Sequence, residues 1–130
     1  MAIPEGVTFI GCAVFYGCSS LASVTIPKGL TDIGSVAFYG CSNLESVEIS
    51  EGITYISPEM FSGCRRLAEI TLPKSVEEIA SWAFSDCSRL KKIIIPEEVL
   101  EIGDYAFSGC SGYLTIYGKT GSCAETYAKE

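Results

Sequence analysis

Apolar residues recur along the chain at a constant step of 23 residues. Two columns of this repeat hold one residue type throughout: Phe15, Phe38, Phe61, Phe84 and Phe107, each followed three residues later by Cys18, Cys41, Cys64, Cys87 and Cys110. Three further columns are aliphatic, with one exception: Ile10, Ile33, Ile56, Ile79 and Ile102; Leu21, Leu44, Leu67 and Leu90, with Tyr113 last; Val24, Val47, Ile70, Ile93 and Ile116. The unit reads I-P-x-x-V-x-x-I-x-x-x-A-F-x-G-C-x-x-L-x-x-V-x. A repeat of this length predicts a solenoid.

Five units follow one another without linkers, over residues 3–25, 26–48, 49–71, 72–94 and 95–117, and residues 118–130 form a different C-terminal segment. A unit of this size has no core of its own, so its apolar positions must be covered by neighbouring coils. We therefore expect one domain over residues 1–130.

The end of each unit alternates apolar and polar residues, as in Leu44-x-x-Val47-x-Ile49, which predicts a short strand with one buried face. Pro27, Pro73 and Pro96 follow this strand and should end it, because proline cannot donate to a strand ladder; Ser50 stands there in the third unit. Each coil should thus give one strand to a parallel sheet. A second apolar group before the Gly-Cys corner predicts a further short extended piece or a helical turn.

The strand pattern resembles the signature of leucine-rich repeats, and the whole unit with its A-F-x-G-C segment resembles the BspA-type (Treponema pallidum-like) class over residues 3–117. The resemblance implies an α/β solenoid, a right-handed coil with a parallel sheet on one face. Residues 118–130 are similar to the C-terminal cap of that class, which implies a short capping helix. Members are mostly secreted or surface-displayed proteins of bacteria and some protists, and several are implicated in adhesion, which implies a cell-surface or secreted location.

Composition narrows the possible partners. Hydrophobic residues make up 48% of the chain, enough for a core, and the net charge of −7 with a pI near 4.6 is the wrong sign for nucleic acid. The longest aliphatic run is Ile93–Ile95, so we expect no membrane insertion, and the first five residues do not resemble a signal peptide.

The residue types argue against catalysis. Histidine is absent and no C-x-x-C motif occurs, so we predict no enzyme, no cofactor and no metal site. The carboxylate pairs Glu77-Glu78 and Glu97-Glu98 suit a solvated acidic ridge better than a calcium site. The five repeat cysteines should be buried and reduced. Cys12 and Cys123 fall outside their column and are candidates for oxidation or crosslinking, with tolerated drift as the alternative.

Variable positions within the predicted strands are the candidate binding residues, because they point away from the core onto the face that solenoids use for docking. The set is Ser23, Thr25, Ser46, Glu48, Glu69, Thr71, Lys92, Ile94, Thr115 and Tyr117. Ile94 and Tyr117 bring chemistry typical of interface anchors. The alternative is that all ten are ordinary solvated positions. A second patch is basic, formed by Arg65, Arg66, Arg89, Lys91 and Lys92, and it suits an acidic partner or a sulfated glycan unless its placement is random.

These observations favour a macromolecular binding or adhesion module that presents the sheet face to a protein or glycan at a cell surface, with host extracellular-matrix or cell-surface molecules as candidate partners. The rival is a structural spacer within a longer repeat protein, with no binding activity of its own. Self-association is also expected, because the first coil offers apolar residues toward a missing neighbour: Ile3, Val7, Ile10, Phe15 and Leu21. A homodimer would then form through the N-terminal coil.

Overall fold

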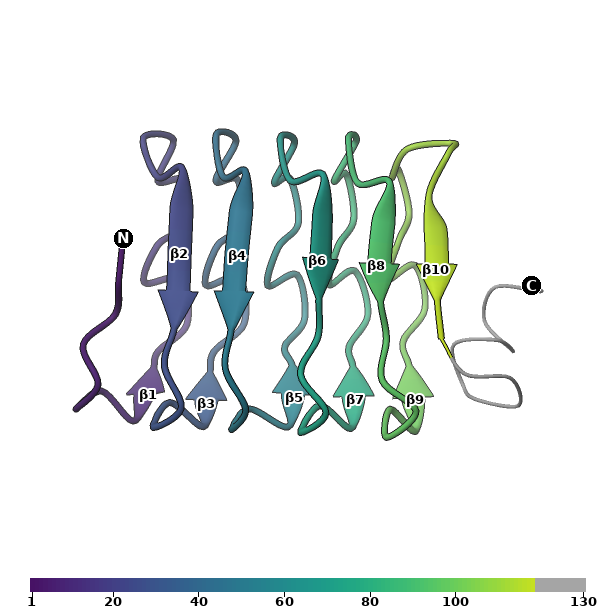
Figure 1. Ribbon diagram of the computed structural model, residues 1–130. Coiled ribbons are helices and arrows are strands. Elements are labelled where there is room, and N and C mark those ends of the chain that lie inside the picture. Colours follow the sequence, from purple (N-terminus) through teal and green to yellow (C-terminus); the bar gives the residue numbers. More distant parts are fainter. Residues whose placement is uncertain (119–130) are drawn as a thin grey trace.

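The computed structural model describes residues 1–118, and they form a parallel β-solenoid (Figure 1). The longer strands lie on one side: β2 Ser23–Ile26, β4 Ser46–Ile49, β6 Glu69–Thr71, β8 Lys92–Ile94 and β10 Thr115–Tyr117. Two-residue strands form a second layer: β1 Phe9–Ile10, β3 Asp32–Ile33, β5 Tyr55–Ile56, β7 Glu78–Ile79 and β9 Glu101–Ile102. All ladders between named strands are parallel.

The strand register confirms that one repeat unit is one coil. Val24 pairs with Val47 and Ile70 pairs with Ile93, so residues 23 positions apart lie side by side. The predicted strand ends are also confirmed, since β2 ends directly before Pro27, and β6 and β8 end two residues before their prolines.

The predicted α/β fold class is wrong for residues 1–118. They contain strands and turns but no helix, because the segment between the two strand layers is a series of tight turns rather than a helical turn. The predicted capping helix within residues 118–130 lies almost wholly outside the described residues.

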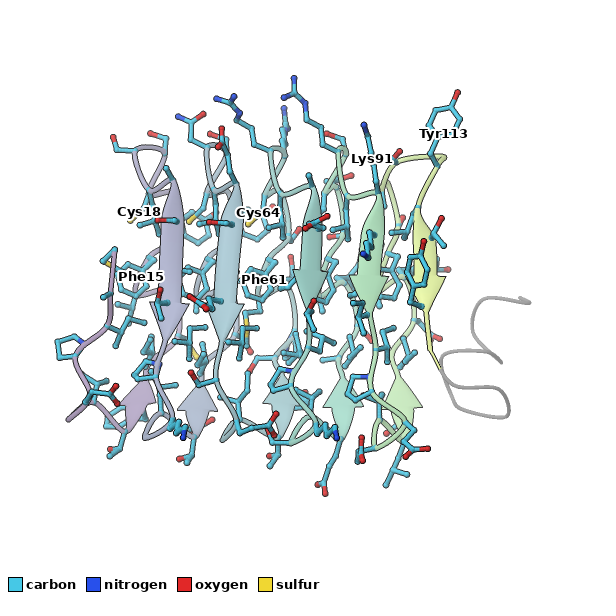
Figure 2. The ribbon with its side chains drawn as sticks, in the orientation of Figure 1. Phe15, Cys18, Phe61, Cys64, Lys91 and Tyr113 are labelled. Atoms are coloured by element: carbon cyan, nitrogen blue, oxygen red, sulfur yellow. The ribbon has the colours of Figure 1, made fainter. Side chains whose placement is uncertain are left out.

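Phenylalanine rings form the centre of the core. Phe38, Phe61 and Phe84 are fully buried, and each ring stacks on the next with centroids 5.4–5.5 Å apart. Phe15 and Phe107 extend the column at its two ends. Figure 2 labels Phe15 in the first coil and Phe61 in the third, both in the interior, with Cys18 and Cys64 above them. The predicted inward column is therefore confirmed.

The cysteine column runs beside the rings, and each thiol from the second coil onward donates a hydrogen bond to the phenylalanine carbonyl of the preceding coil. Cys64 Sγ lies 3.3 Å from the Phe38 oxygen and Cys87 Sγ lies 3.1 Å from the Phe61 oxygen. All five repeat cysteines are free thiols, as predicted; the three central ones are buried, and Cys18 and Cys110 are partly covered. Burial raises the pKa of the Cys64 thiol to about 12.

Backbone hydrogen bonds of the A-F-x-G segment join every coil to the next. At the first junction Ala13, Phe15 and Gly17 donate to carbonyls of the second coil at 3.0, 2.9 and 2.7 Å. Equivalent sets of three join the later coils, so this ladder is unbroken from the first coil to the fifth.

Both strand layers, by contrast, are interrupted between the second and third coils. No ladder joins β4 to β6 or β3 to β5, and β4 and β6 stand visibly apart in Figure 1. The single parallel sheet that the sequence predicts is therefore divided into a pair and a triplet of strands.

At the two ends of the stack, the structure differs from what the sequence led us to expect. Tyr113, expected in the leucine column, is 86% exposed and projects from the upper edge in Figure 2, while the adjacent Leu114 packs against the core. The phenol avoids losing its hydrogen bonds to water. At the N-terminus, Met1–Ile3 runs along β2, with the Thr25 amide donating to the Met1 carbonyl at 2.9 Å, so the edge of β2 is partly paired and Ile3 is buried.

Replacing Phe61 by Ala should lower the free energy of unfolding by about 3–5 kcal/mol, because it removes a fully buried ring stacked on both sides. Phe9, which is 66% exposed, is the matched control, and Phe9→Ala should cost less than about 1 kcal/mol. Urea denaturation measures both. Equal losses for the two variants would contradict the inward column.

Thiol labelling should discriminate the cysteines by position. Cys12 is exposed, whereas Cys64 is buried with a raised pKa, and the thiolate is the reactive form. With the folded protein near pH 8, we expect a maleimide to modify Cys12 at least ~100-fold faster than Cys64. Peptide mapping by mass spectrometry reads each site separately. Rapid modification of Cys64 would show that its column is open to solvent.

Candidate partner-binding face

The ten predicted binding positions lie on the outer face of the β2–β10 strands, and all of them are exposed. Strand register places them in two columns that cross the strands. One column runs through Ser23, Ser46, Glu69, Lys92 and Thr115, and the other through Thr25, Glu48, Thr71, Ile94 and Tyr117. The sequence pattern thus predicted correctly that these ten side chains are exposed.

A cleft of about 740 Å³ opens on this face at the interrupted junction between β4 and β6. Five of the ten predicted residues line it: Ser46, Glu48, Glu69, Thr71 and Ile94. Ser23, Thr25, Lys92, Thr115 and Tyr117 lie on the flanking strands and outside the cleft. The structure therefore divides the predicted set into a hollowed centre and two flat margins.

The floor of the cleft is apolar. Val47 and Ile49 of β4 are only partly buried, whereas Val24 and Ile26 of the neighbouring strand β2 are 2% and 0% exposed. Because β4 and β6 share no ladder, backbone amide and carbonyl groups along their facing edges are not paired with each other. An unpaired strand edge above an apolar floor is chemistry that an extended peptide can complete.

Interior volume gives a physical reason for the opening. Met60 is fully buried in a column that holds Ala37, Ala83 and Ala106 in the adjoining coils, so the third coil brings a larger side chain into the core. On the short-strand layer, the Ser57 hydroxyl donates to the Ile33 carbonyl. At the other junctions a backbone amide fills this role, as where Gly34 donates to the Ile10 carbonyl at 2.8 Å. The side-chain hydroxyl extends further from the chain than a backbone amide, so it can bridge the interrupted junction between the second and third coils.

The cleft is acidic. Glu45, Glu48, Glu51 and Glu69 line it against one cation, Lys74, a net charge of −3 from four carboxylates and one ammonium. Two of the carboxylates have structural partners: Glu45 forms an ion pair with Arg66 at 3.1 Å, and Glu51 accepts hydrogen bonds from the amides of Lys74 and Ser75 at 3.0 Å each.

The side-chain carboxylates of Glu48 and Glu69 have no hydrogen-bonded or ion-paired partner within residues 1–118. They are the carboxylates available to a cationic ligand.

Beyond the cleft, Lys92 holds its ammonium 5.3 Å from the centroid of the Tyr117 ring, a cation–π contact on the outer face. Ile94 is 36% exposed and Tyr117 is 50% exposed. This margin combines an aromatic ring, an aliphatic side chain and a charge, which is the composition of many interface centres.

Sequence reasoning missed three charged residues of the cleft wall, Glu45, Glu51 and Lys74, which lie near the strand ends. Ser50 in place of the usual proline was the available signal that the third coil departs from the pattern. The five basic patch residues are all exposed, with Lys91 at the upper edge in Figure 2. Cys12 is exposed as expected, and Cys123 lies outside the described residues.

Within residues 1–118 no cluster of three or more histidine, cysteine, aspartate or glutamate residues has a metal-binding arrangement. The same part of the chain has no helix with the length and hydropathy needed to cross a membrane.

Stacked parallel coils, an inward leucine and phenylalanine pattern and an exposed sheet face define a leucine-rich-repeat protein. The chain belongs to the family described as BspA type leucine rich repeat region, whose signature matches residues 1–113 in six copies. No curated protein matches it.

Solved structures give the same fold. A leucine rich cell surface protein from Faecalibacterium prausnitzii A2-165 is 36% identical with a TM-score of 0.90, over 98% of this chain and 34% of that one. The leucine rich repeat protein of T. pallidum is 33% identical with a TM-score of 0.85, over 89% of this chain and 56% of that one. A leucine-rich repeat protein from Bacteroides ovatus ATCC 8483 is 27% identical with a TM-score of 0.72, over 92% of this chain and 42% of that one. The chain thus spans about a third to just over half of these proteins.

Proposed function

We propose that this chain is a binding module of a bacterial cell-surface or secreted protein, and that it docks a partner protein through the β2–β10 face. The observation that carries the proposal is the acidic, apolar-floored cleft between β4 and β6, which five of the ten variable strand residues line. Its unpaired strand edges suit an extended segment, its floor suits an apolar side chain, and Glu48 and Glu69 suit a neighbouring lysine or arginine. Extracellular-matrix and cell-surface proteins offer such segments, and adhesion is the role we propose.

Surface location is supported by the F. prausnitzii relative, which is described as a cell surface protein. The repeat fold supports a binding role, because solenoids of this kind present an extended surface to partners. The rival is a spacer that positions other parts of a longer protein. If the chain is such a spacer, no ligand should bind the β2–β10 face directly.

The test uses an array of overlapping peptides from extracellular-matrix proteins, with a glycan array alongside. We expect bound peptides to combine an apolar residue with nearby lysine or arginine, and binding to weaken as ionic strength rises. The double substitution Glu48→Lys and Glu69→Lys should weaken binding of a captured peptide at least ~10-fold.

A matched control makes the same change of charge away from the cleft, with Glu98→Lys and Glu101→Lys, which are both exposed. It should leave binding unchanged. A cleft variant and a control variant that lose binding equally would indicate nonspecific charge attraction. If the wild-type chain binds no peptide and no glycan, the result favours the spacer.

A second proposal concerns the N-terminal end, where an apolar depression of about 300 Å³ is lined by residues that include Phe9, Val14 and Phe15. Phe9 and Val14 are 66% and 55% exposed. Apolar area of this kind is covered when a second copy packs against it. We propose a homodimer through the N-terminal coil.

Sedimentation velocity across a dilution series tests the dimer. The wild-type chain should show a concentration-dependent shift from monomer to dimer, and Phe9→Asp should abolish the dimer by placing a charge on the apolar end. Leu100→Asp is the control, because Leu100 is 79% exposed elsewhere on the surface. A monomer at all concentrations, under reducing and oxidising conditions, would overturn the proposal.

A further inference from the structure

The A-F-x-G segments run behind the β2–β10 strands in Figure 1, and they carry outward-facing aromatic pairs as well as the inward phenylalanines. Tyr16 stacks on Tyr39 with centroids 5.0 Å apart, and Trp82 stacks on Tyr105 with centroids 4.7 Å apart. Tyr16, Trp82 and Tyr105 are 57%, 43% and 61% exposed. These rings stabilise little of the core and leave ring faces and edges open to solvent.

Between the two pairs the third coil places smaller or polar residues. Ser62 stands in the column of Tyr16 and Tyr39, and Glu59 stands in the column of Trp82 and Tyr105. The result is a depression of about 320 Å³, lined by Tyr39, Glu59, Ser62, Trp82, Ser85 and Asp86. It is separate from the cleft on the sheet face, with which it shares no residue.

The walls of this depression are held by the one ladder that is unbroken along the solenoid. The amides of Trp82 and Asp86 donate to carbonyls of the fifth coil at 3.2 and 2.7 Å, and the Glu59 amide donates to the fourth coil at 3.4 Å. On the floor, the buried hydroxyls of Ser62 and Ser85 hydrogen-bond to each other at 2.6 Å. The lining is therefore preorganised rather than assembled from mobile loops.

Asp86 occupies a backbone position that glycine fills in the other four coils: Gly17, Gly40, Gly63 and Gly109. Its φ of 57° lies in the left-handed region, which aspartate tolerates better than most residues other than glycine. The aspartate adds a carboxylate at the edge of the depression, where glycine would leave only backbone.

We propose that this depression binds a neutral carbohydrate. The negative face of an indole or phenol ring attracts the polarised C–H groups on the flat face of a pyranose, and Trp82 and Tyr39 offer such rings from opposite sides. Glu59 and Asp86 are acceptors for sugar hydroxyls, and hydrogen bonds to a carboxylate are stronger than neutral ones. The two carboxylates repel sulfated and sialylated sugars, so the class is an uncharged glycan.

The combination of rings and carboxylates also occurs where proteins bind quaternary ammonium groups. Such sites enclose a compact cation among several rings, whereas here Tyr39 and Trp82 belong to coils two ladder steps apart, roughly 10 Å, with polar residues between them. An extended, polyhydroxylated ligand matches this alternation of ring and acceptor better than a small cation does.

Trp82 is the only tryptophan of the chain, so its fluorescence reports on this depression directly. The whole chain is titrated with cellotriose, maltotriose, chitotriose and mannotriose, each as a separate neutral probe. We expect a saturable change in Trp82 emission with at least one of them, with a dissociation constant of about 1 mM, as suits a shallow site.

Two variants retain the fluorescent reporter. Tyr39→Ala removes one aromatic wall and Glu59→Gln replaces a carboxylate by a neutral amide of the same shape; each should weaken binding ~10-fold or more. Tyr113→Ala, at an exposed tyrosine on the upper edge, and the sheet-face double variant Glu48→Lys and Glu69→Lys are the controls, and both should bind sugar as the wild-type chain does. Far-UV circular dichroism checks that every variant is folded.

The proposal is overturned by any of three results: no saturable response to the four neutral sugars, a response that Tyr39→Ala and Glu59→Gln leave unchanged, or binding of tetramethylammonium without binding of sugar. Because the sheet-face variants and the Tyr39 and Glu59 variants affect separate sites, failure here is distinguishable from failure of the protein-docking proposal.

Discussion

Three backbone hydrogen bonds at each junction, donated by the A-F-x-G segment of one coil to the next, are the connection on which the rest of the solenoid depends. Because they fix one ladder step between coils, phenylalanine rings of successive units must stack, with centroids 5.2–5.5 Å apart. The thiols then reach the phenylalanine carbonyls of the preceding coil. Residues that occur once per unit thereby become continuous columns through the molecule.

The third unit shows what this arrangement tolerates. Met60 enlarges the interior and Ser57 replaces an amide by a hydroxyl, yet the ladder behind the sheet stays intact at this junction, with Phe38 donating to Met60 at 3.0 Å. The strain is accommodated on the strand layers, which separate. On the opposite side, one outward column changes from tyrosine to serine at this unit, where Ser62 follows Tyr39, and the second hollow lies there. Both candidate binding sites therefore border the unit that departs most from the repeat.

Period and residue type were enough to predict the coils, the strand register, the inward phenylalanines and the exposed face, because each follows from one unit repeated. The divided sheet and the acidic cleft were not predictable in this way. They depend on the distance between two particular coils, and that distance is set by the volume of Met60 against Ala37. The exposure of Tyr113 was also not predicted, because the adjacent Leu114 packs against the core in its place. The aromatic hollow could be recognised only from the coil geometry, which brings Tyr39, Ser62 and Ser85 into one column.

A ladder that repeats identically at every junction makes whole units interchangeable, so the number of coils is a variable on which recombination can act. Loss of the codons for residues 49–71 would join Glu48 to Leu72 in the same register and bring the second and fourth coils into contact. Tyr39 would then face Ser85 directly, and both hollows would close in a single genetic event. Duplication of the same unit would lengthen them instead. The shape of both hollows is thus open to change by copy number as well as by point substitution.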